Sequence, residues 1–596
     1  MQVFPNPDNP IWTQNNTTDL FGNLYATRNI NLERVGYIGL SRRMKSIPTP
    51  FTNGRVLAMT FAGSSYKGIL PSTMVSIDPV TMVITTDTTG GASSGDGSSD
   101  IIYWNNTTYY TNSTSLQKLS GTYSSVMTLT TASYTIGGSS YLIYHPICLF
   151  DNKILLAIGD GNIVRTIDEA NTPGTSLVLP KQYMIDWIRY FGNKLYIGTR
   201  NISGGDGNVF VWDGATAQAE AAYPYYAPYA CSGIFFNSTL YIWTIRGQIL
   251  QFTGGGFREV ARFPFLNKDY NVLREGTSNR KESMIVLGDQ ILIGIGNVLW
   301  NGSSNISDIF VDNFYSGVWS YDKTHGLTHK YSTVMTTDIT TPTEFGKLNE
   351  SSGISLFPLV DPSFLAFGVP PLNTLGSTLF ISSTSYDFET VLNNRTLMTI
   401  TTGEARGYFQ TKKIININFK NNNKKLYLKY RGVTDTNDKI ILKYKEIEKK
   451  LLPSPTTLTF PTTWTSSTTF TSSSSLFGTN VSVGDEIELL YSNSNGAGAG
   501  YIAHITSIVN NAGTYTITID ETITGAGVGA GNFMAIKVDN FKKLMTVDST
   551  TAPIDQEVEI PIDVSSKWIS IKVEMRGEDV EIEQLILVDS VDTPAV

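Results

Sequence analysis

Short apolar runs that follow two-residue polar turns dominate the first two thirds of the chain. Phe150-Asp151-Asn152 precedes the apolar run 154–158, and the same phrase returns at Phe191-Gly192-Asn193, Phe236-Asn237-Ser238 and Leu287-Gly288-Asp289. These turns begin at residues 150, 191, 236 and 287, so the repeat is roughly 40–50 residues long. A period of this length with several short strands in each repeat is typical of a β-propeller.

Weaker copies extend the repeat in both directions. They stand at Phe51-Thr52-Asn53 and Trp104-Asn105-Asn106 upstream, and at Val360-Asp361-Pro362 downstream. With the four clear copies they predict a propeller of about seven blades over residues 51–403, with six or eight blades as alternatives. Residues 1–50 are predicted to form an N-terminal arm and a strand.

The last third of the chain alternates apolar with polar residues, as half-buried strands do. The alternating runs are Ile414–Phe419, Lys425–Tyr430, Val558–Ile562 and Trp568–Val573. They predict one discontinuous β-sandwich, built from residues 404–450 and 546–596. Residues 412–450 hold twelve basic and four acidic residues, whereas residues 551–596 hold eleven acidic and three basic ones. Opposite charge favours two halves of one domain, and two unrelated solvated faces are the alternative.

Residues 451–545 interrupt this sandwich. Pro453–Phe477 is rich in Ser, Thr and Pro and is predicted to be a linker without a core of its own. The apolar runs after it, with glycine-rich turns between them, predict a small inserted β-barrel. Because an insertion at a surface hairpin has a small closure entropy, we expect this barrel to project outward as an interaction element.

Composition agrees with an all-β protein of several domains. The chain has 596 residues, more than one core accommodates, and it is rich in Thr, Ser, Asn, Tyr and Phe. A net charge of −8 gives no basic footprint for non-specific nucleic-acid binding. Cys148 and Cys231 fall on different predicted blades and are expected to be free thiols. No transmembrane span and no secretory leader is expected, because Met1–Pro10 is polar.

The sequence marks no catalytic, cofactor-binding or metal-binding residue. The four histidines, at positions 145, 325, 329 and 504, are scattered, and His325 and His329 fit a solvated hairpin better than a zinc site. Asp160 and Asp206 lack the alternating oxygen ligands of a calcium loop. Two carboxylates facing each other across a propeller axis stay open as an alternative. We therefore expect a protein that is not an enzyme and that uses no cofactor.

Three phrases resemble segments of tail-associated structural proteins of tailed bacteriophages. They are Asn31–Ser41, with its Gly-Tyr-Ile-Gly-Leu-Ser ending, Arg406–Thr411 and Trp568–Gly577. The domain plan is also similar to that of nozzle proteins of short-tailed phages, although the insertion at 451–545 departs from it.

This resemblance implies a virion protein, assembled in the host cytoplasm, that forms a homo-oligomeric ring in a nozzle, hub or tail tip. Such a ring lines or closes the DNA exit channel, contacts passing genomic DNA without reading its sequence, and anchors other tail, adaptor or fibre proteins. A closed ring needs two complementary surfaces on each subunit. The opposite charges of the C-terminal segments therefore also fit contacts between subunits.

Two other hypotheses stay open. One is a carbohydrate-binding or carbohydrate-cleaving propeller of the virion that meets the host surface. Tyr223, Tyr225, Tyr226 and Tyr229 would then stack on sugars, although a Tyr- and Pro-rich loop between blades is the simpler interpretation. The other is a cytoplasmic propeller adaptor, which the polar β-rich flanking domains disfavour.

Overall fold

A computed structural model describes the structure of most of the chain. The described residues are 2–4, 24–28, 30–32, 37–40, 42–47, 58–69, 74–78, 83–86, 100–120, 122–130, 133–136, 139–150, 154–228, 230–263, 283–295, 317–332, 354–358, 379–383, 397–403, 406–411, 414–415, 424–435, 438–445, 457–479, 481–492, 502–522, 529–539, 541–553, 556–562, 568–577 and 579–589. Within them the regular structure is β-strand apart from the four-residue helix α3 (Leu476–Thr479), so the all-β prediction is confirmed.

Seven four-stranded antiparallel sheets occupy the described residues between 42 and 403. The first three are β6 (Ala58–Ala62), β7 (Ser65–Ile69), β8 (Met74–Ile77) and β9 (Ile84–Thr86); β10 (Ile101–Trp104), β11 (Thr107–Thr111), β12 (Ser115–Ser120) and β13 (Thr122–Thr128); and β16 (Ile147–Phe150), β17 (Leu155–Asp160), β18 (Ile163–Ile167) and β19 (Leu177–Val178). A separate hairpin, β14 (Ser133–Ile136) and β15 (Ser139–Leu142), lies between the second and third sheets in sequence.

The next three sheets follow the same order. They are β20 (Tyr183–Phe191), β21 (Lys194–Asn201), β22 (Gly207–Trp212) and β23 (Ala221–Tyr225); β24 (Ala230–Phe236), β25 (Thr239–Thr244), β26 (Gln248–Phe252) and β27 (Phe257–Arg262); and β28 (Met284–Leu287), β29 (Gln290–Ile295), β30 (Gly317–Asp322) and β31 (Gly326–Ser332). The seventh combines β32 (Ile354–Pro358), β33 (Leu379–Ser383) and β34 (Leu397–Gly403) with β5 (Arg42–Ile47), which comes from the N-terminal part of the chain.

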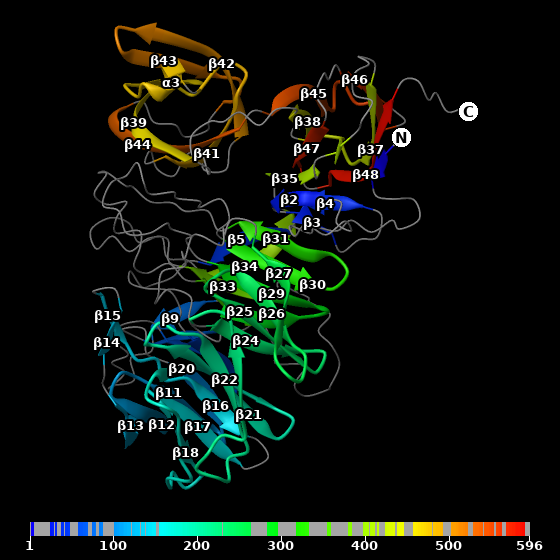
Figure 1. Cartoon of the computed structure of the whole chain (residues 1–596). Helices are drawn as coiled ribbons and strands as arrows, with labels where there is room; N and C mark the ends of the chain where they lie inside the picture. The colour runs from blue at the N-terminus through cyan, green and yellow to red at the C-terminus, as the bar shows by residue number, and fades with distance from the viewer. Residues whose placement is uncertain are drawn as a thin grey trace.

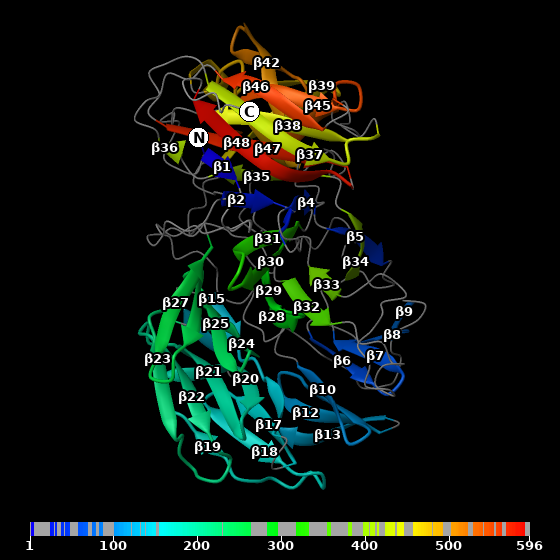
Figure 2. The same cartoon turned by 90° about the vertical axis from the view of Figure 1, so that its right-hand side faces the viewer.

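The sheets pack against one another in sequence order. The first strand of each sheet lies against the first strand of the next, from β6 and β10 through to β28 and β32 (Figures 1 and 2). Separate hydrophobic clusters fill the spaces between neighbouring sheets; Trp243 and Trp319, for example, share the cluster between the fifth and sixth. Short sheets arranged in this way form a propeller-like array.

The predicted two-residue turns join the first and second strands of these sheets. Phe191 pairs with Lys194 and Phe236 with Thr239, so each turn has two central residues. Left-handed backbone angles, which such turns require, occur at Asn105, Asn106, Gly192, Asn193, Asn237, Ser238 and Gly288. The turns predicted at residues 104, 191, 236 and 287 are therefore confirmed.

The two outermost copies of the repeat stay predictions, and the turn of the first sheet lies elsewhere. Phe51–Asn53 and Val360–Pro362 lie outside the described residues, and the turn of the first sheet is Gly63-Ser64, between the paired residues Ala62 and Ser65. The residue directly before this turn is Ala62, where the confirmed copies have Phe, Trp or Leu. The repeat pattern therefore did not indicate a turn at this place.

Two six-stranded sheets enclose one further hydrophobic core. The first consists of β1 (Gln2–Phe4), β3 (Ile30–Asn31), β4 (Ile38–Leu40), β37 (Lys424–Arg431), β46 (Glu557–Ile562) and β48 (Glu581–Asp589). The second consists of β2 (Leu24–Arg28), β35 (Arg406–Thr411), β36 (Ile414–Ile415), β38 (Lys439–Lys445), β45 (Lys542–Asp548) and β47 (Trp568–Arg576). Buried residues of both sheets, such as Leu428 and Ile571, belong to the same cluster.

The basic and acidic segments meet within this part of the chain. Lys425 of β37 pairs with Glu559 of β46 at 2.5 Å, and Arg431 pairs with Glu581 of β48. Lys429 lies 3.6 Å from a carboxylate on each side. The prediction that the two segments of opposite charge belong together is confirmed.

The described N-terminal residues belong to the sheets and not to a separate arm. Strands β1 to β4 complete the six-stranded sheets, and β5 completes the seventh four-stranded sheet. These strands are too short to be stable alone, because a strand gains its hydrogen bonds and burial from its neighbours. β3 pairs with the neighbouring strand β4, but β1, β2, β4 and β5 each have a partner about 350 or more residues later, which no local pattern reveals.

A closed six-stranded barrel lies beside the second six-stranded sheet (Figure 1). Its strands are β39 (Thr457–Ser466), β40 (Thr469–Ser472), β41 (Glu486–Ser492), β42 (Ile502–Asn511), β43 (Thr514–Ile519) and β44 (Gly529–Asp539). The predicted linker 453–477 is wrong for its described part, because β39, β40 and α3 belong to the barrel. Trp464, Phe470 and Phe477 are buried in its core, so three aromatic rings supply the burial that the Ser/Thr-rich composition seemed to lack.

The tightest packing inside the array surrounds Trp187, and it gives a test of that packing. A Cβ on Gly198 would lie 1.9 Å from Trp187 Cε2. We expect Gly198→Ala to lower the free energy of unfolding of the array by about 2–3 kcal/mol, because the Trp187 ring is fully buried, also lies close to Gly233 and has little room to move. Gly255→Ala, in a turn with open space around it, is the control and should change little. Tryptophan fluorescence during denaturation measures both, and equal curves would contradict the packing.

Candidate functional site

The strand β47 carries charged residues on one face and apolar residues on the other. Ile569, Ile571, Val573 and Met575 enter the hydrophobic core, and Lys572, Glu574 and Arg576 alternate with them. Alternation places the second set on the opposite face of the sheet. That face is buried as well: the exposed fractions of Lys572, Glu574 and Arg576 are 4%, 2% and 6%.

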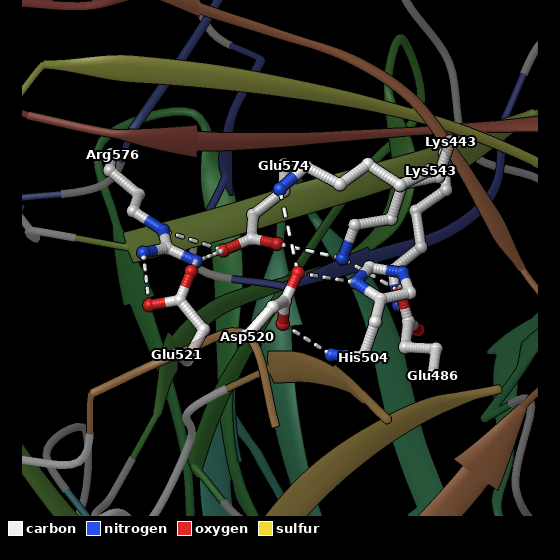
Figure 3. Close-up of polar contacts among 9 residues, drawn as sticks. Lys443, Glu486, His504, Asp520, Glu521, Lys543, Glu574 and Arg576 are labelled. Carbon is white, nitrogen blue, oxygen red and sulfur yellow. Dashed lines mark hydrogen bonds and ion pairs between the residues drawn. The ribbon is translucent and has the colours of Figure 1, made fainter. Parts of the chain in front are cut away.

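The barrel covers this charged face. It contributes Glu486 at the start of β41, His504 on β42, and Asp520 and Glu521 directly after β43. Neighbouring strands of the sheet add Lys443 from β38 and Lys543 from β45. Figure 3 shows these side chains converging from both sides of the contact. We call the nine residues the interface network: Lys443, Glu486, His504, Asp520, Glu521, Lys543, Lys572, Glu574 and Arg576.

Glu486 is the centre of one half of the interface network. Its Oε2 lies 2.7 Å from Lys443 Nζ, and its Oε1 lies 2.6 Å from Lys572 Nζ. Lys443 also donates to Glu574 Oε2 at 2.9 Å. One buried lysine therefore bridges a barrel carboxylate and a sheet carboxylate.

Arg576 is the centre of the other half. Its two terminal nitrogens donate to the two oxygens of Glu521, each at 3.0 Å, and its Nε donates to Glu574 Oε1 at 2.8 Å. The contact with Glu521 is a two-bond pair between planar groups, which is the strongest geometry for a guanidinium and a carboxylate. It again joins the sheet to the barrel.

His504 and Asp520 form a third contact within the barrel. The amide of His504 donates to Asp520 Oδ1 at 2.6 Å, and its Nδ1 lies 3.4 Å from Asp520 Oδ2. The other ring nitrogen, Nε2, lies 3.9 Å from Glu486 Oε2. Lys543 Nζ reaches the same aspartate at 3.5 Å, so this pair also faces the sheet.

The cations keep the buried carboxylates ionised. Burial alone would raise the pKa of Glu486, but Lys443 and Lys572 outweigh it and hold the pKa at about 2. Burial likewise raises the pKa of Glu574, but Lys443 and Arg576 lower it further, to about 2. For Asp520, burial raises and His504 lowers the pKa, to about 2.

Two aromatic rings enclose the ammonium group of Lys572. Its Nζ lies 4.1 Å from the centre of the Tyr408 ring and 5.3 Å from that of Phe541. Both distances are within the range of a cation–π contact. Phe541 is fully buried and stands between the last barrel strand, β44, and β45 of the sheet. The interface network therefore contacts the point where the chain leaves the barrel.

The interface network is suited to fixing two bodies together. Each of its carboxylates has at least one cation within 3.0 Å or, for Asp520, a histidine and a lysine within 3.5 Å. Charges paired in this way are costly to separate, because removing one partner leaves the other buried and unpaired. Among the described residues no group of three His, Cys, Asp or Glu side chains is arranged to hold a metal ion.

The other histidines have separate environments. His145 is buried, with Nδ1 3.0 Å from the carbonyl of Gly159. His325 lies in the β30–β31 turn beside Asp322, as expected, whereas His329 is fully buried against the edge of Trp319. The solvated-turn interpretation is therefore wrong for His329, because its side chain is fully buried on β31, opposite Trp319.

The remaining residues that the sequence singled out do not come together. Asp160 is buried and accepts from the amide of Thr130 and from Arg165 Nε, at 2.7 and 2.6 Å. Asp206 is exposed in the β21–β22 turn. Cys231 is buried and Cys148 half-buried, on the first strands of two different sheets, and both are free thiols as expected.

The described tyrosines of the tyrosine-rich loop have different environments. Tyr225 is buried and Tyr223 packs on Phe252, with ring centres 4.7 Å apart. Tyr226 is exposed, and Tyr229 lies outside the described residues. Of the sugar-binding cluster that was left open as an alternative, one exposed ring remains among the described tyrosines.

The interface network was missed at the sequence level. Lys572, Glu574 and Arg576 were seen only as part of an alternating strand, and Glu486 only as part of a barrel strand. One signal was present in the sequence. The polar positions of Trp568–Arg576 carry both positive and negative charges, and the positions between them are all apolar. A charged face of this kind is ordinarily solvated, so the sequence did not reveal its cover.

Comparisons with known proteins give no family. No protein-family model and no curated protein matches the chain. Among solved structures, it is similar to the computationally designed protein Ika8, at 9% identity and a TM-score of 0.33, over 60% of this chain and 100% of that chain. It is also similar to BamB from Moraxella catarrhalis, at 10% identity and a TM-score of 0.33, over 63% of this chain and 92% of that one.

A third likeness is to a chain in a mitotic checkpoint complex. The identity is 12% and the TM-score 0.33, over 61% of this chain and 95% of that chain. Scores this low carry no argument about function. Among the described residues, no helix has the length and apolar character that crossing a membrane requires.

The depressed pKa values predict loss of the barrel contact in acid. A carboxyl group whose pKa falls on folding stabilises the protein above its unfolded pKa, and this contribution is lost as the pH falls through the folded value. For Glu486 the window runs from the ordinary 4.5 down to about 2, which corresponds to about 3 kcal/mol. We expect the stability of wild type to fall more steeply in this window than that of Glu486→Gln, in denaturant titrations at several pH values. Parallel curves would contradict the assignment.

Proposed function

We propose that the chain is a non-enzymatic structural subunit of a bacteriophage tail, in a nozzle, hub or tail-tip ring. In this role it lines or closes the DNA exit channel and anchors neighbouring tail, adaptor or fibre proteins. The observation that carries the proposal is how the propeller-like array is joined to the six-stranded sheets. A subunit of a tail transmits force between its parts, so the connection between them has to be stiff.

Two crossings of the chain, not one, form this connection. β4 ends at Leu40 and β5 begins at Arg42, while β34 ends at Gly403 and β35 begins at Arg406. Arg42 pairs with Gly403 on the array side, and β2 pairs with β35 on the other side. The chain therefore crosses between the two parts twice, once between β4 and β5 and once between β34 and β35. β2 and β3 also lie against β31 of the array.

The three phrases that resemble phage tail proteins gather around this connection. Asn31–Ser41 contains β4, Arg406–Thr411 is β35, and Trp568–Gly577 contains β47. β35 and β47 are neighbouring strands, with Arg406 opposite Arg576. Gly577 has a φ of +103°, and a Cβ there would lie 2.0 Å from Asp438 Oδ1, so its place after Arg576 has a steric cause. Phrases separated by hundreds of residues thus belong to one structural unit, which supports the resemblance.

We further propose that the seven sheets are the blades of a closed propeller and that the six-stranded sheets form a β-sandwich. In the seventh sheet the outer strand, β5, comes from the beginning of the chain, whereas β32 to β34 come from the end of the array. This pairing would join the two ends of the ring through backbone hydrogen bonds. The shared core of the six-stranded sheets supports a sandwich in the same way.

Proline substitutions in β5 test ring closure. Met44 and Lys45 are successive residues opposite Ile400 and Thr399. In an antiparallel edge strand only one of two successive amides donates to its neighbour. We expect one of Met44→Pro and Lys45→Pro to destabilise the array by about 1–3 kcal/mol and the other to have a smaller effect. Thermal unfolding measures the difference, and two variants as stable as wild type would argue against closure by β5.

The ring proposal predicts a fixed stoichiometry. Head-to-tail contacts between identical subunits close into a ring when the rotation between them divides a full turn. We expect the purified chain, alone or with its tail neighbours, to form one closed assembly in mass photometry and electron microscopy, and to be present in purified phage particles. A chain that stays monomeric at high concentration and is absent from particles would refute the proposal.

A further inference from the structure

The barrel has the properties of a separate folding unit. Its six strands close on themselves, so that no edge strand needs a partner from another part of the chain. Among the described residues its core consists of buried barrel residues, such as Trp464, Ile487 and Ile517, and includes none from the six-stranded sheets. The core of those sheets likewise contains no barrel residue.

The contact between the two bodies is ionic. On the barrel side it consists of the acidic residues Glu486, Asp520 and Glu521 with His504, and on the sheet side of Lys443, Lys543, Lys572 and Arg576 with Glu574. An apolar contact tolerates the replacement of one apolar side chain by another of similar size. A buried ionic contact depends instead on every partner being present.

The interface network also reaches the connection to the array. Lys572 binds Glu486 of the barrel and lies against the ring of Tyr408 on β35. β35 is the strand that enters directly from β34 of the array, and it pairs with β2 on its other edge. A single ammonium group thus contacts both the barrel and the connecting strand.

We infer that the barrel is an independently folded module which the interface network holds on β47 as an ionic latch, and that the closed latch braces the strands connecting the sheets to the array. This inference stands apart from the tail proposal, because it depends only on contacts within one chain. A partner that pulls on the barrel would act on the connection through Lys572 and Tyr408. Opening the latch would free the barrel without unfolding it.

Hydrogen exchange of the full chain at pH 7 tests this inference, with Glu486→Gln as the variant. Glutamine keeps the size of the side chain but leaves Lys443 and Lys572 without their shared carboxylate. We expect at least tenfold faster exchange in β47, β35 and β2. The barrel strands β42 and β43 and the array strand β21 should exchange as in wild type. Asp520→Asn, which removes a contact at the edge of the interface network, should give a smaller change in the same strands.

Glu559→Gln is the matched control, because Glu559 makes an exposed pair with Lys425 outside the interface network. It should leave exchange in β47, β35 and β2 unchanged. Faster exchange of β42 and β43 in Glu486→Gln would show that the barrel does not fold independently. Unchanged exchange in β47 would overturn the latch, and a change in β47 without one in β35 and β2 would overturn the bracing of the connection. If Glu486→Gln does not fold, hydrogen exchange of Asp520→Asn in β47, β35, β2, β42 and β43 is judged by the same outcomes.

Discussion

Burial of a charged sheet face determines how the C-terminal half of the molecule is built. β47 has an apolar face in the core and a charged face under the barrel, so both of its faces are removed from water. Apolar residues would be buried at no electrostatic cost. Lys572, Glu574 and Arg576 lose their hydration, and partners of opposite charge at short distance must compensate for the free energy of that loss. The barrel supplies those partners, which fixes its position and orientation on the sheet.

A different constraint governs the propeller-like array. Its sheets are short, and each hydrophobic cluster lies between two neighbours, so that no sheet has a complete core alone. Stability therefore depends on contacts between consecutive sheets, as in other repeat architectures. The end sheets lack one neighbour unless the ends meet, and this is where the N-terminal strand β5 joins β34. The same strand follows β4 of the six-stranded sheets, so the closure that we propose for the array would involve the same few residues as the attachment of those sheets.

Several elements were predictable because their determinants are local. The turns at Asn105, Gly192 and Asn237 follow from residues that tolerate left-handed backbone angles between apolar runs. The alternating strands of the last third follow from the period of two. The linker prediction for 453–477 is wrong because the segment is mostly Ser, Thr and Pro, whereas its few aromatic residues lie in the centre of the barrel core. Three large rings are enough to anchor a small barrel.

The sequence by itself determined the local backbone: the hairpins, the strands, the repeat and the segregation of basic from acidic segments. The tertiary structure alone decided which distant strands pair and which charged faces are buried. β5 pairs with β34 and β2 pairs with β35 across 350 or more residues. The charged face of β47 is buried only because the barrel lies on it. The reason is physical: turns and periodicity depend on neighbours in sequence, whereas desolvation of Lys572 and Glu574 depends on what lies above them in space.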